Sequence, residues 1–161
     1  MKYILYLYTG MFSGIDSDKP EELQDCLRGK LQKEAIVKNT NDILADEHDF
    51  RKELRGSDCV VLVGSGQASS LIQNQQQETE DGLIIFDGKV IHEEFTGNRK
   101  LVEKLIMVFF TEKNKNDWIP TGMDEKRIFR LKGEKIWEGN PALDHLEYTI
   151  RRVLGETVLD W

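Results

Sequence analysis

Two short apolar runs constrain the fold of this chain more than any other feature of its sequence. Residues 59–63 read Cys-Val-Val-Leu-Val, residues 105–110 read Leu-Ile-Met-Val-Phe-Phe, and each run leads directly into small or polar residues. Short continuous apolar runs rich in β-branched and aromatic residues are typical of strands buried on both faces. Such strands belong to parallel sheets covered by helices. In open sheets of this kind, binding surfaces form at the loops beyond the carboxyl ends of the strands.

Length, charge and the N-terminal segment limit the class of protein. A chain of 161 residues predicts one domain over residues 1–161, large enough to bury about 70% of its unfolded surface. The net charge of −7 argues against nucleic acid as a partner, because phosphate-backbone binding demands a basic footprint. Residues 1–8 are shorter than the roughly 20 apolar residues of a membrane span and lack a signal-peptide cleavage pattern. We therefore expect a soluble cytoplasmic protein without membrane insertion.

Cysteine and histidine spacing gives no support for a metal site. Cys26 and Cys59 form no CxxC or Cys/His motif, so both are interpreted as buried reduced thiols. His92 and His145 lie far apart in sequence and form no HxxxH pair. His48, within an acidic segment, is expected only to titrate near neutrality. The sequence predicts no bound metal.

The rest of the chain alternates strand and helix patterns. Strands are predicted at residues 3–8 and 35–37, with helices opening at Pro20 and covering 46–56. The alternation predicts right-handed crossovers and a parallel sheet. Asn140 and the proline after it start an amphipathic closing helix. The apolar positions expected to face the core of the three helices are Leu23, Cys26, Leu27 and Leu31, then Phe50 and Leu54, then Leu143, Leu146, Ile150, Val153 and Leu154.

Three segments leave their structure open. Residues 83–91 predict a hairpin with its turn at Asp87-Gly88, or else a helix over residues 89–95. Residues 127–137 are open in the same way, with Lys132-Gly133 as a candidate turn between two short edge strands. The polar run at 73–78 is either a solvated helix end or a surface loop.

Several segments of the second half follow one another in a characteristic order and spacing. They are Glu80-Asp81-Gly82-Leu83, Ile91-His92-Glu93-Glu94-Phe95, residues 104–110 and Trp118-Ile119-Pro120. Together they resemble a SEFIR domain, the relative of the Toll/interleukin-1 receptor (TIR) domain found in interleukin-17 receptors and their adaptor. The first half shares the architecture, and residues 57–65 are similar to a Ser-Asp-x-Val-Ile-Val-x-x-Ser strand of both families. Departures include Met107, where the family often has proline.

The resemblance implies a flavodoxin-like, three-layer α/β fold whose central, mostly parallel sheet has about five strands. It also implies an intracellular signalling module of innate immunity that has no cofactor and works by homotypic assembly. Its partners would be other SEFIR/TIR-like domains, a second copy of the chain among them. Contacts of this kind use helix faces and the loop after the second strand, here residues 38–42, and mixed surface charge suits them. The predicted interaction residues are Asp46, Glu47, Asp49, Arg51, Arg55, Glu93 and Phe95.

The resemblance also implies an enzymatic alternative, because some TIR domains cleave NAD at its glycosidic bond. A glutamate then stabilises the developing oxocarbenium charge or acts as a base. The candidates here are Glu94 and Glu78, with NAD as substrate rather than cofactor. Gly64, Ser65 and Gly66 follow a predicted strand and are the candidates for binding its phosphates at a helix N-terminus, although they match no P-loop.

A nucleotide-binding or flavin-binding relative of flavodoxin is the third function considered. Its response-regulator variant requires paired acidic residues after the first strand and an aspartate after the third. Thr9-Gly10 and Gly64-Ser65 occupy those positions, so this variant is excluded.

Overall fold

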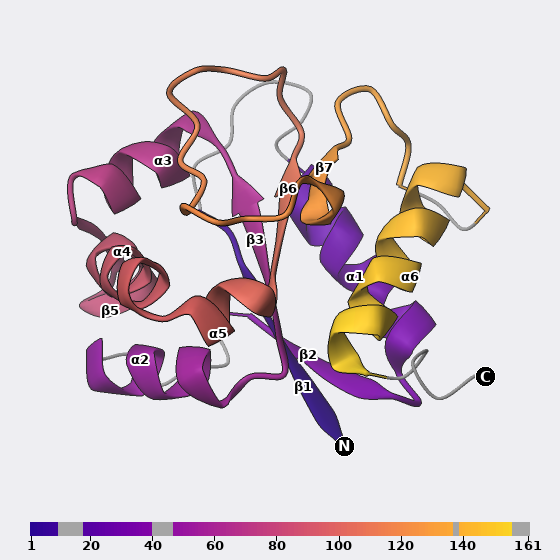
Figure 1. Ribbon diagram of the computed structural model, residues 1–161, viewed down its shortest axis with the longest axis horizontal. Helices are drawn as coiled ribbons and strands as arrows, with labels where there is room; N and C mark the ends of the chain where they lie inside the picture. Colours follow the sequence, from indigo (N-terminus) through magenta and orange to yellow (C-terminus); the bar gives the residue numbers. More distant parts are fainter. Residues whose placement is uncertain (10–17, 40–46, 137–138, 156–161) are drawn as a thin grey trace.

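A central sheet of five parallel strands organises the chain in the computed structural model, which describes residues 1–9, 18–39, 47–136 and 139–155. The strand order is β2-β1-β3-β6-β7 (Figure 1). The chain places β2 on one side of β1 and then crosses to β3 on the other side, which is the doubly wound arrangement of flavodoxin-like folds. The predicted fold class is confirmed. The strands are β1 (Lys2–Leu7), β2 (Ala35–Lys38), β3 (Cys59–Gly64), β6 (Leu105–Phe109) and β7 (Ile128–Arg130).

Helices cover both faces of this sheet (Figure 1). One face carries α1 (Lys19–Leu31) and α6 (Pro141–Leu154). The other face carries α2 (Glu47–Gly56), α3 (Gly66–Gln73), α4 (Gly88–Gly97) and the short α5 (Arg99–Glu103). The side chains of β1 alternate between the two layers, because successive residues of a strand point to opposite faces. Ile4 and Tyr6 join the core under α1 and α6, whereas Leu5 and Leu7 join the core under α2 to α5.

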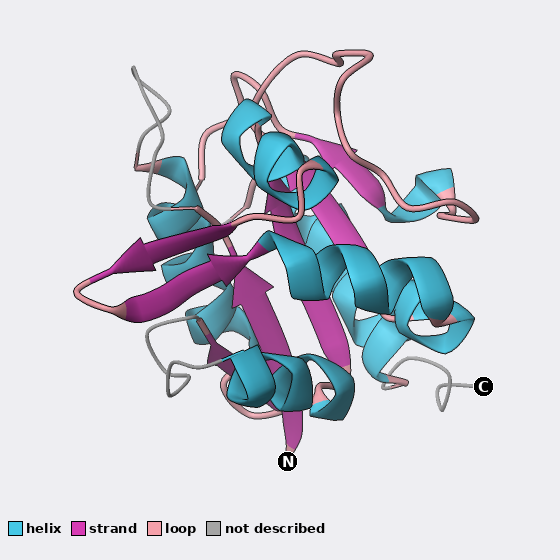
Figure 2. Cartoon of the chain, turned by 90° about the vertical axis from the view of Figure 1, so that its left-hand side faces the viewer, coloured by secondary structure: helices cyan, strands magenta, loops and turns pink. Residues whose placement is uncertain are grey.

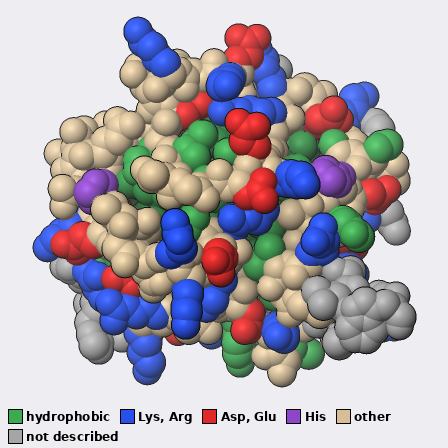
Figure 3. All heavy atoms as spheres, viewed as in Figure 1, with side chains coloured by type: hydrophobic (Ala, Val, Ile, Leu, Met, Phe, Trp, Pro, Cys, Tyr) green, Lys and Arg blue, Asp and Glu red, His purple; other side chains and the backbone are tan. Residues whose placement is uncertain are grey.

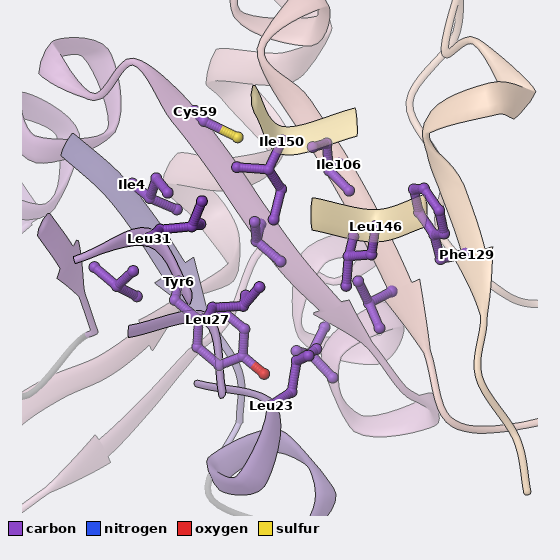
Figure 4. Close-up of a cluster of buried hydrophobic side chains, with 14 of the residues drawn as sticks. Ile4, Tyr6, Leu23, Leu27, Leu31, Cys59, Ile106, Phe129, Leu146 and Ile150 are labelled. Carbon is purple, nitrogen blue, oxygen red and sulfur yellow. The ribbon is translucent and has the colours of Figure 1, made fainter. Parts of the chain in front are cut away.

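The two apolar runs that opened the sequence analysis lie side by side at the centre of the sheet. β3 pairs with β6 in parallel, with Val60 opposite Leu105 and Gly64 opposite Phe109. Every residue of both strands is buried. Figure 4 shows one side of this core, where Cys59 and Ile106 meet Ile150 and Leu146 of α6. Burial raises the pKa of the Cys59 thiol, whereas Cys26 is only partly buried.

The helix interpretation of residues 89–95 is correct, and a hairpin turn at Asp87-Gly88 is wrong. Asp87 ends β5 (Leu83–Asp87) and caps α4, its side chain accepting a hydrogen bond of 3.0 Å from the backbone N–H of Val90. Gly88 is required by close packing rather than by a turn, since a Cβ there would collide with the backbone carbonyl groups of Leu71 and Gln76. The local Asp-Gly signal was therefore a helix start.

A hairpin turn does occur at the preceding Asp-Gly pair, Asp81-Gly82. β4 (Gln77–Glu80) runs antiparallel to β5, and Asp81 and Gly82 connect the two strands with φ angles of 53° and 79°. Two successive positive φ values are typical of the type I′ hairpin turn. Figure 2 shows this two-stranded ribbon projecting from the body of the domain. The polar run at 73–78 thus forms the end of α3 and the start of β4.

A pair of edge strands around Lys132-Gly133 is also wrong. Residues 128–130 form β7, which pairs with β6 in parallel, and residues 131–136 form a turn and an irregular segment. Gly133 does turn the chain, with a φ of 78°, but toward α6 rather than into a returning strand. Trp137 lies outside the described residues.

The apolar stripes of the three predicted helices point inward. Four of the five positions expected of the closing helix are buried in α6, and Val153 packs partly against the same core. In α1 the predicted leucines are buried. Phe50 and Leu54 of α2 are buried under the other layer. Helix formation here follows from burial of one amphipathic face on the sheet.

Replacing Asp87 by alanine should destabilise the fold by about 2 kcal/mol, because the change removes both the cap of α4 and the acceptor for the side-chain amide of Gln77. Urea unfolding followed by circular dichroism measures the loss. Asn98→Ala, which removes the cap of the five-residue helix α5, is the matched control and should cost about 1 kcal/mol. Equal losses in the two variants would contradict the second role of Asp87.

Candidate interaction surface and clefts

An ion-pair cluster joins α2 to α4. Arg51 of α2 donates to Glu93 at 2.8 Å and to Glu94 at 2.9 Å. Arg55, one turn further along α2, donates to both carboxylate oxygens of Glu94. The two helices are separated by about 40 positions in sequence, yet packing against the same face of the sheet brings their charged residues together. We call these four residues the α2–α4 cluster.

Glu94 is the centre of the cluster. Its side chain is 7% exposed, and three guanidinium N–H groups donate to its two oxygens. Hydrogen bonds from Arg55 and Arg51 hold the pKa of this carboxyl below its ordinary value, against the opposing effect of burial. Arg51 lowers the pKa of Glu93 in the same way. The arrangement keeps both carboxylates ionised and holds the two helices in one relative position.

Several predicted interaction residues are placed differently from the expectation. Phe95 is 2% exposed and packs edge-on against Trp118, with ring centroids 6.2 Å apart, so its side chain cannot contact a partner. Asp46 lies outside the described residues, and for Glu47 and Asp49 only the backbone of α2 is described.

Among the described side chains of α2 and α4, three charged ones are exposed. The side chain of Arg55 is 61% exposed and that of Glu93 is 42% exposed. Lys52, on the same helix as Arg55, is exposed as well. We call the surface formed by Lys52, Arg55 and Glu93 the α2–α4 face. It carries charges of both signs on two helices fixed by the cluster beneath.

A polar cleft of about 450 Å³ lies between α3 and the segment that follows β6. It opens at the carboxyl ends of β3 and β6, where ligand sites of this fold class are expected. Gly66 lines it, which places one of the three predicted phosphate-binding residues at a cleft. The described residues that line this cleft include the carboxylates of Glu112 and Asp117 and no lysine or arginine.

Gly64 and Ser65 have structural roles at the start of this cleft. The hydroxyl of Ser65 caps α3 by accepting a hydrogen bond of 3.0 Å from the N–H of Ala68. Gly64 lies against the ring of Phe109, and a Cβ at this position would overlap the ring. The small residue at the end of β3 is thus explained by packing, without any ligand.

The two candidate catalytic glutamates lie on different elements. Glu94 is held within the α2–α4 cluster, with donors on both oxygens. Glu78 is half-exposed on β4, opposite Phe86 of β5. Neither residue is among those that line the cleft beside α3. The structure does not bring either carboxylate together with Gly66.

A second, larger cleft was not predicted. It measures about 710 Å³ and lies between α5, the 3-10 helix η3 (Glu125–Arg127) and α6. Its cations are spread over more than fifty sequence positions, so no local charge run or motif in the sequence indicates this cleft. We call this cleft the basic groove. Its basic side chains are Lys100, Lys104, Lys126, Arg127 and Arg152.

The described residues contain no group of three or more His, Cys, Asp and Glu side chains arranged to hold a metal ion. They also contain no helix that is long and apolar enough to cross a membrane.

Gly64→Ala should destabilise the protein by about 1–3 kcal/mol, because the added methyl group must displace the buried ring of Phe109. Gly66→Ala is the matched control, since a Cβ there meets nothing within 4 Å and alanine is the better helix former. Its stability should stay within about 1 kcal/mol of the parent. Thermal unfolding of both variants decides the point, and a Gly64→Ala protein as stable as the parent would refute the packing role.

Glu94→Gln should destabilise the protein by about 1–3 kcal/mol at neutral pH, because it removes a buried, charge-assisted partner of two arginines. The pKa of Glu94 is lowered by folding, so its contribution is present above the ordinary value of 4.5 and is lost as the pH falls through the lower folded value. The difference between parent and variant in urea unfolding should therefore shrink below about pH 4.5.

Glu93→Gln is the control for this titration, since the exposed partner of Arg51 should contribute less. A difference between the parent and Glu94→Gln that does not change with pH would show that the ion pairs do not carry the effect.

No family model and no curated protein matches this sequence. Among solved structures, the crystal structure of a prokaryotic SEFIR domain is similar over 96% of this chain and 99% of that chain. The TM-score is 0.57 and the sequence identity is 15%. At this identity the likeness speaks for the fold, and it agrees with the resemblance in the sequence. The chain has the fold of a SEFIR domain.

Proposed function

We propose that this protein is a signalling interaction module that self-associates through the α2–α4 face. Two findings support the proposal. The fold is that of a SEFIR domain over nearly the whole chain. The α2–α4 face combines exposed cations and an exposed carboxylate on two adjacent helices, and this is the observation that carries the proposal.

The ion pairs beneath the face favour a docking role. Arg51 and Arg55 fix α2 to α4 through Glu94, so the two helices and the side chains of Arg55 and Glu93 are held in place before any partner arrives. Pre-organised side chains lose less conformational entropy on binding than mobile ones. A rigid charged face can therefore discriminate between partners through charge complementarity.

The presence of both charge signs suits pairing between identical copies. In a two-fold interface each patch meets its own copy, so a positive group of one protomer must meet a negative group of the other. Lys52 and Arg55 on α2 and Glu93 on α4 provide the two signs on one surface. Antiparallel apposition of two α2–α4 faces would bring the cations of each copy to the glutamate of the other.

The enzymatic alternative is less well supported. Both oxygens of Glu94 already accept hydrogen bonds from arginines. The cleft beside α3 has no lysine or arginine among its described lining residues, and its two carboxylates, Glu112 and Asp117, are already paired with Lys132 and Arg130, whereas the NAD diphosphate would need cations. Assembly without catalysis is therefore the function that this geometry favours.

Analytical ultracentrifugation over a range of concentrations tests the proposal. The parent should associate at low salt and dissociate when the ionic strength is raised, since exposed charge pairs are screened. Lys52→Glu should raise the dissociation constant at least about fivefold, the equivalent of about 1 kcal/mol. Lys52 is the residue of choice because its side chain makes no hydrogen bond or ion pair with the described residues, whereas reversals at Arg51 or Glu94 would break the cluster.

Lys33→Glu is the matched control. Lys33 is also exposed but follows α1 on the opposite layer, so the same change of charge there should leave association unchanged. A parent that remains monomeric at every concentration at low salt would overturn self-association. A dissociation constant that changes neither with Lys52→Glu nor with salt would overturn the assignment of the α2–α4 face.

A further inference from the structure

The basic groove has no part in the proposed assembly, and its location separates it from the predicted ligand site. Lys104 directly precedes β6 and Arg127 directly precedes β7, so the groove opens at the amino ends of these strands. The cleft beside α3 opens at their carboxyl ends. On the face shown in Figure 3, Lys and Arg side chains with a few carboxylates between them cover the region of α5, η3 and α6.

The charge of the groove opposes that of the chain. Five cations line it against two carboxylates, those of Glu103 and Asp124, although the whole chain has a net charge of −7. Side chains of one sign within a cleft concentrate the local potential and attract ligands of the opposite sign. The groove therefore presents a positive potential to small anions, although the chain as a whole is acidic.

Two of the cations have structural roles that shape the groove. Arg127 donates to the backbone carbonyl groups of Val102 and Leu105, and Lys104 donates to the carbonyl of Ser57 at 3.1 Å. These bonds fix the ends of α5 and β6, so the walls are formed in the absence of a ligand.

Two other cations are available for a ligand. Lys100 and Lys126 make no side-chain hydrogen bond or ion pair with the described residues. They lie on α5 and η3, on two different walls. Two lysines from separate elements that line one cavity suit an anion with several oxygens, such as a phosphate or diphosphate group.

The third wall, formed by α6, contributes an aromatic surface. Tyr148 lines the groove and is 51% exposed, and Arg152 lies 6.0 Å from the centre of its ring. A half-exposed tyrosine beside a guanidinium group offers a flat ligand ring both stacking and cation–π contacts. The groove thus combines cations on two walls with an aromatic surface on the third, within a volume typical of small-molecule sites.

We propose that the basic groove binds a small organic phosphate that carries a planar ring, of the size of a nucleoside diphosphate. The phosphates lie between Lys100 and Lys126, and the ring lies against Tyr148. Phosphate is preferred over a single carboxylate because two lysines that make no ion pair with the described residues line one cavity. A small molecule is preferred over an acidic peptide because the cations and the aromatic ring enclose a hollow rather than a flat surface.

Isothermal titration calorimetry with ADP tests the proposal on the intact chain. ADP should bind with a stoichiometry of one, pyrophosphate more weakly, and adenosine without measurable heat, because the phosphates supply most of the attraction. Lys100→Ala combined with Lys126→Ala should weaken ADP binding at least about tenfold. Tyr148→Ala should weaken ADP binding while leaving pyrophosphate binding unchanged, which separates the ring contact from the charge contact.

Lys113→Ala combined with Lys115→Ala is the matched control. It removes the same two charges from exposed positions in the segment after β6, at the other end of the sheet, and should leave ADP binding unchanged. All the groove variants concern side chains without described hydrogen bonds, and an unchanged melting temperature without ligand confirms that they fold.

Three results would overturn the proposal. The first is that neither ADP nor pyrophosphate binds at millimolar concentration. The second is that both pairs of lysine substitutions weaken ADP binding equally, which would show non-specific charge attraction. A glutamate-rich peptide that binds the parent in preference to ADP would assign the groove to an acidic protein segment. None of these results bears on self-association, which is tested through Lys52 on a different helix.

Discussion

The fold depends on the parallel pairing of β3 with β6 at the centre of the sheet. Both strands are apolar along their whole length and buried on both sides, so helices must cover each face and no binding group can project from the strands themselves. Polar chemistry is thereby moved to the strand ends and to the outer helix surfaces. The same packing decides the residue that follows the apolar run of β3. Phe109 fills the space over Gly64, and the small residue that suggested a phosphate loop is a requirement of the core.

The sheet could be predicted from sequence because strands buried on both faces are continuous apolar runs. The helices could be predicted because their apolar residues repeat at helical spacing. The segment after α3 could not be assigned, because two Asp-Gly pairs six residues apart carry the same local signal. Asp81 and Gly82 adopt the positive φ values of a hairpin turn. Asp87 instead caps a helix, and Gly88 fits against the carbonyl of Leu71. Tertiary packing determines which of the two Asp-Gly dipeptides forms a turn and which starts a helix, and no local sequence pattern distinguishes them.

The candidate sites were predicted less completely than the fold, for a related reason. The charges of α2 and of the segment at 93–94 were singled out from the sequence, but their mutual pairing depends on two helices that lie more than thirty residues apart in sequence and meet on one face of the sheet. Once paired, Glu94 holds the helices together and is no longer a free surface charge. Phe95 turns inward because it packs into the core beneath α4, with its ring edge-on to that of Trp118. The basic groove left no signal at all, since its lysines and arginines come from three separate elements.

Net charge is therefore a poor guide to what this surface attracts. The acidic net charge argued against nucleic acid as a partner, and this argument rests on the broad basic footprint that an extended phosphate backbone requires. It does not extend to a small anion. In the α2–α4 cluster the arginines are matched by carboxylates, whereas in the groove Arg127 and Lys104 donate to neutral carbonyl groups and keep their charge unbalanced. A cation bound to a backbone carbonyl stabilises the fold and still contributes its field to the cavity beside it. The groove is thus positive in an acidic protein because the cations at the ends of α5 and β6 bind backbone carbonyl groups rather than carboxylates.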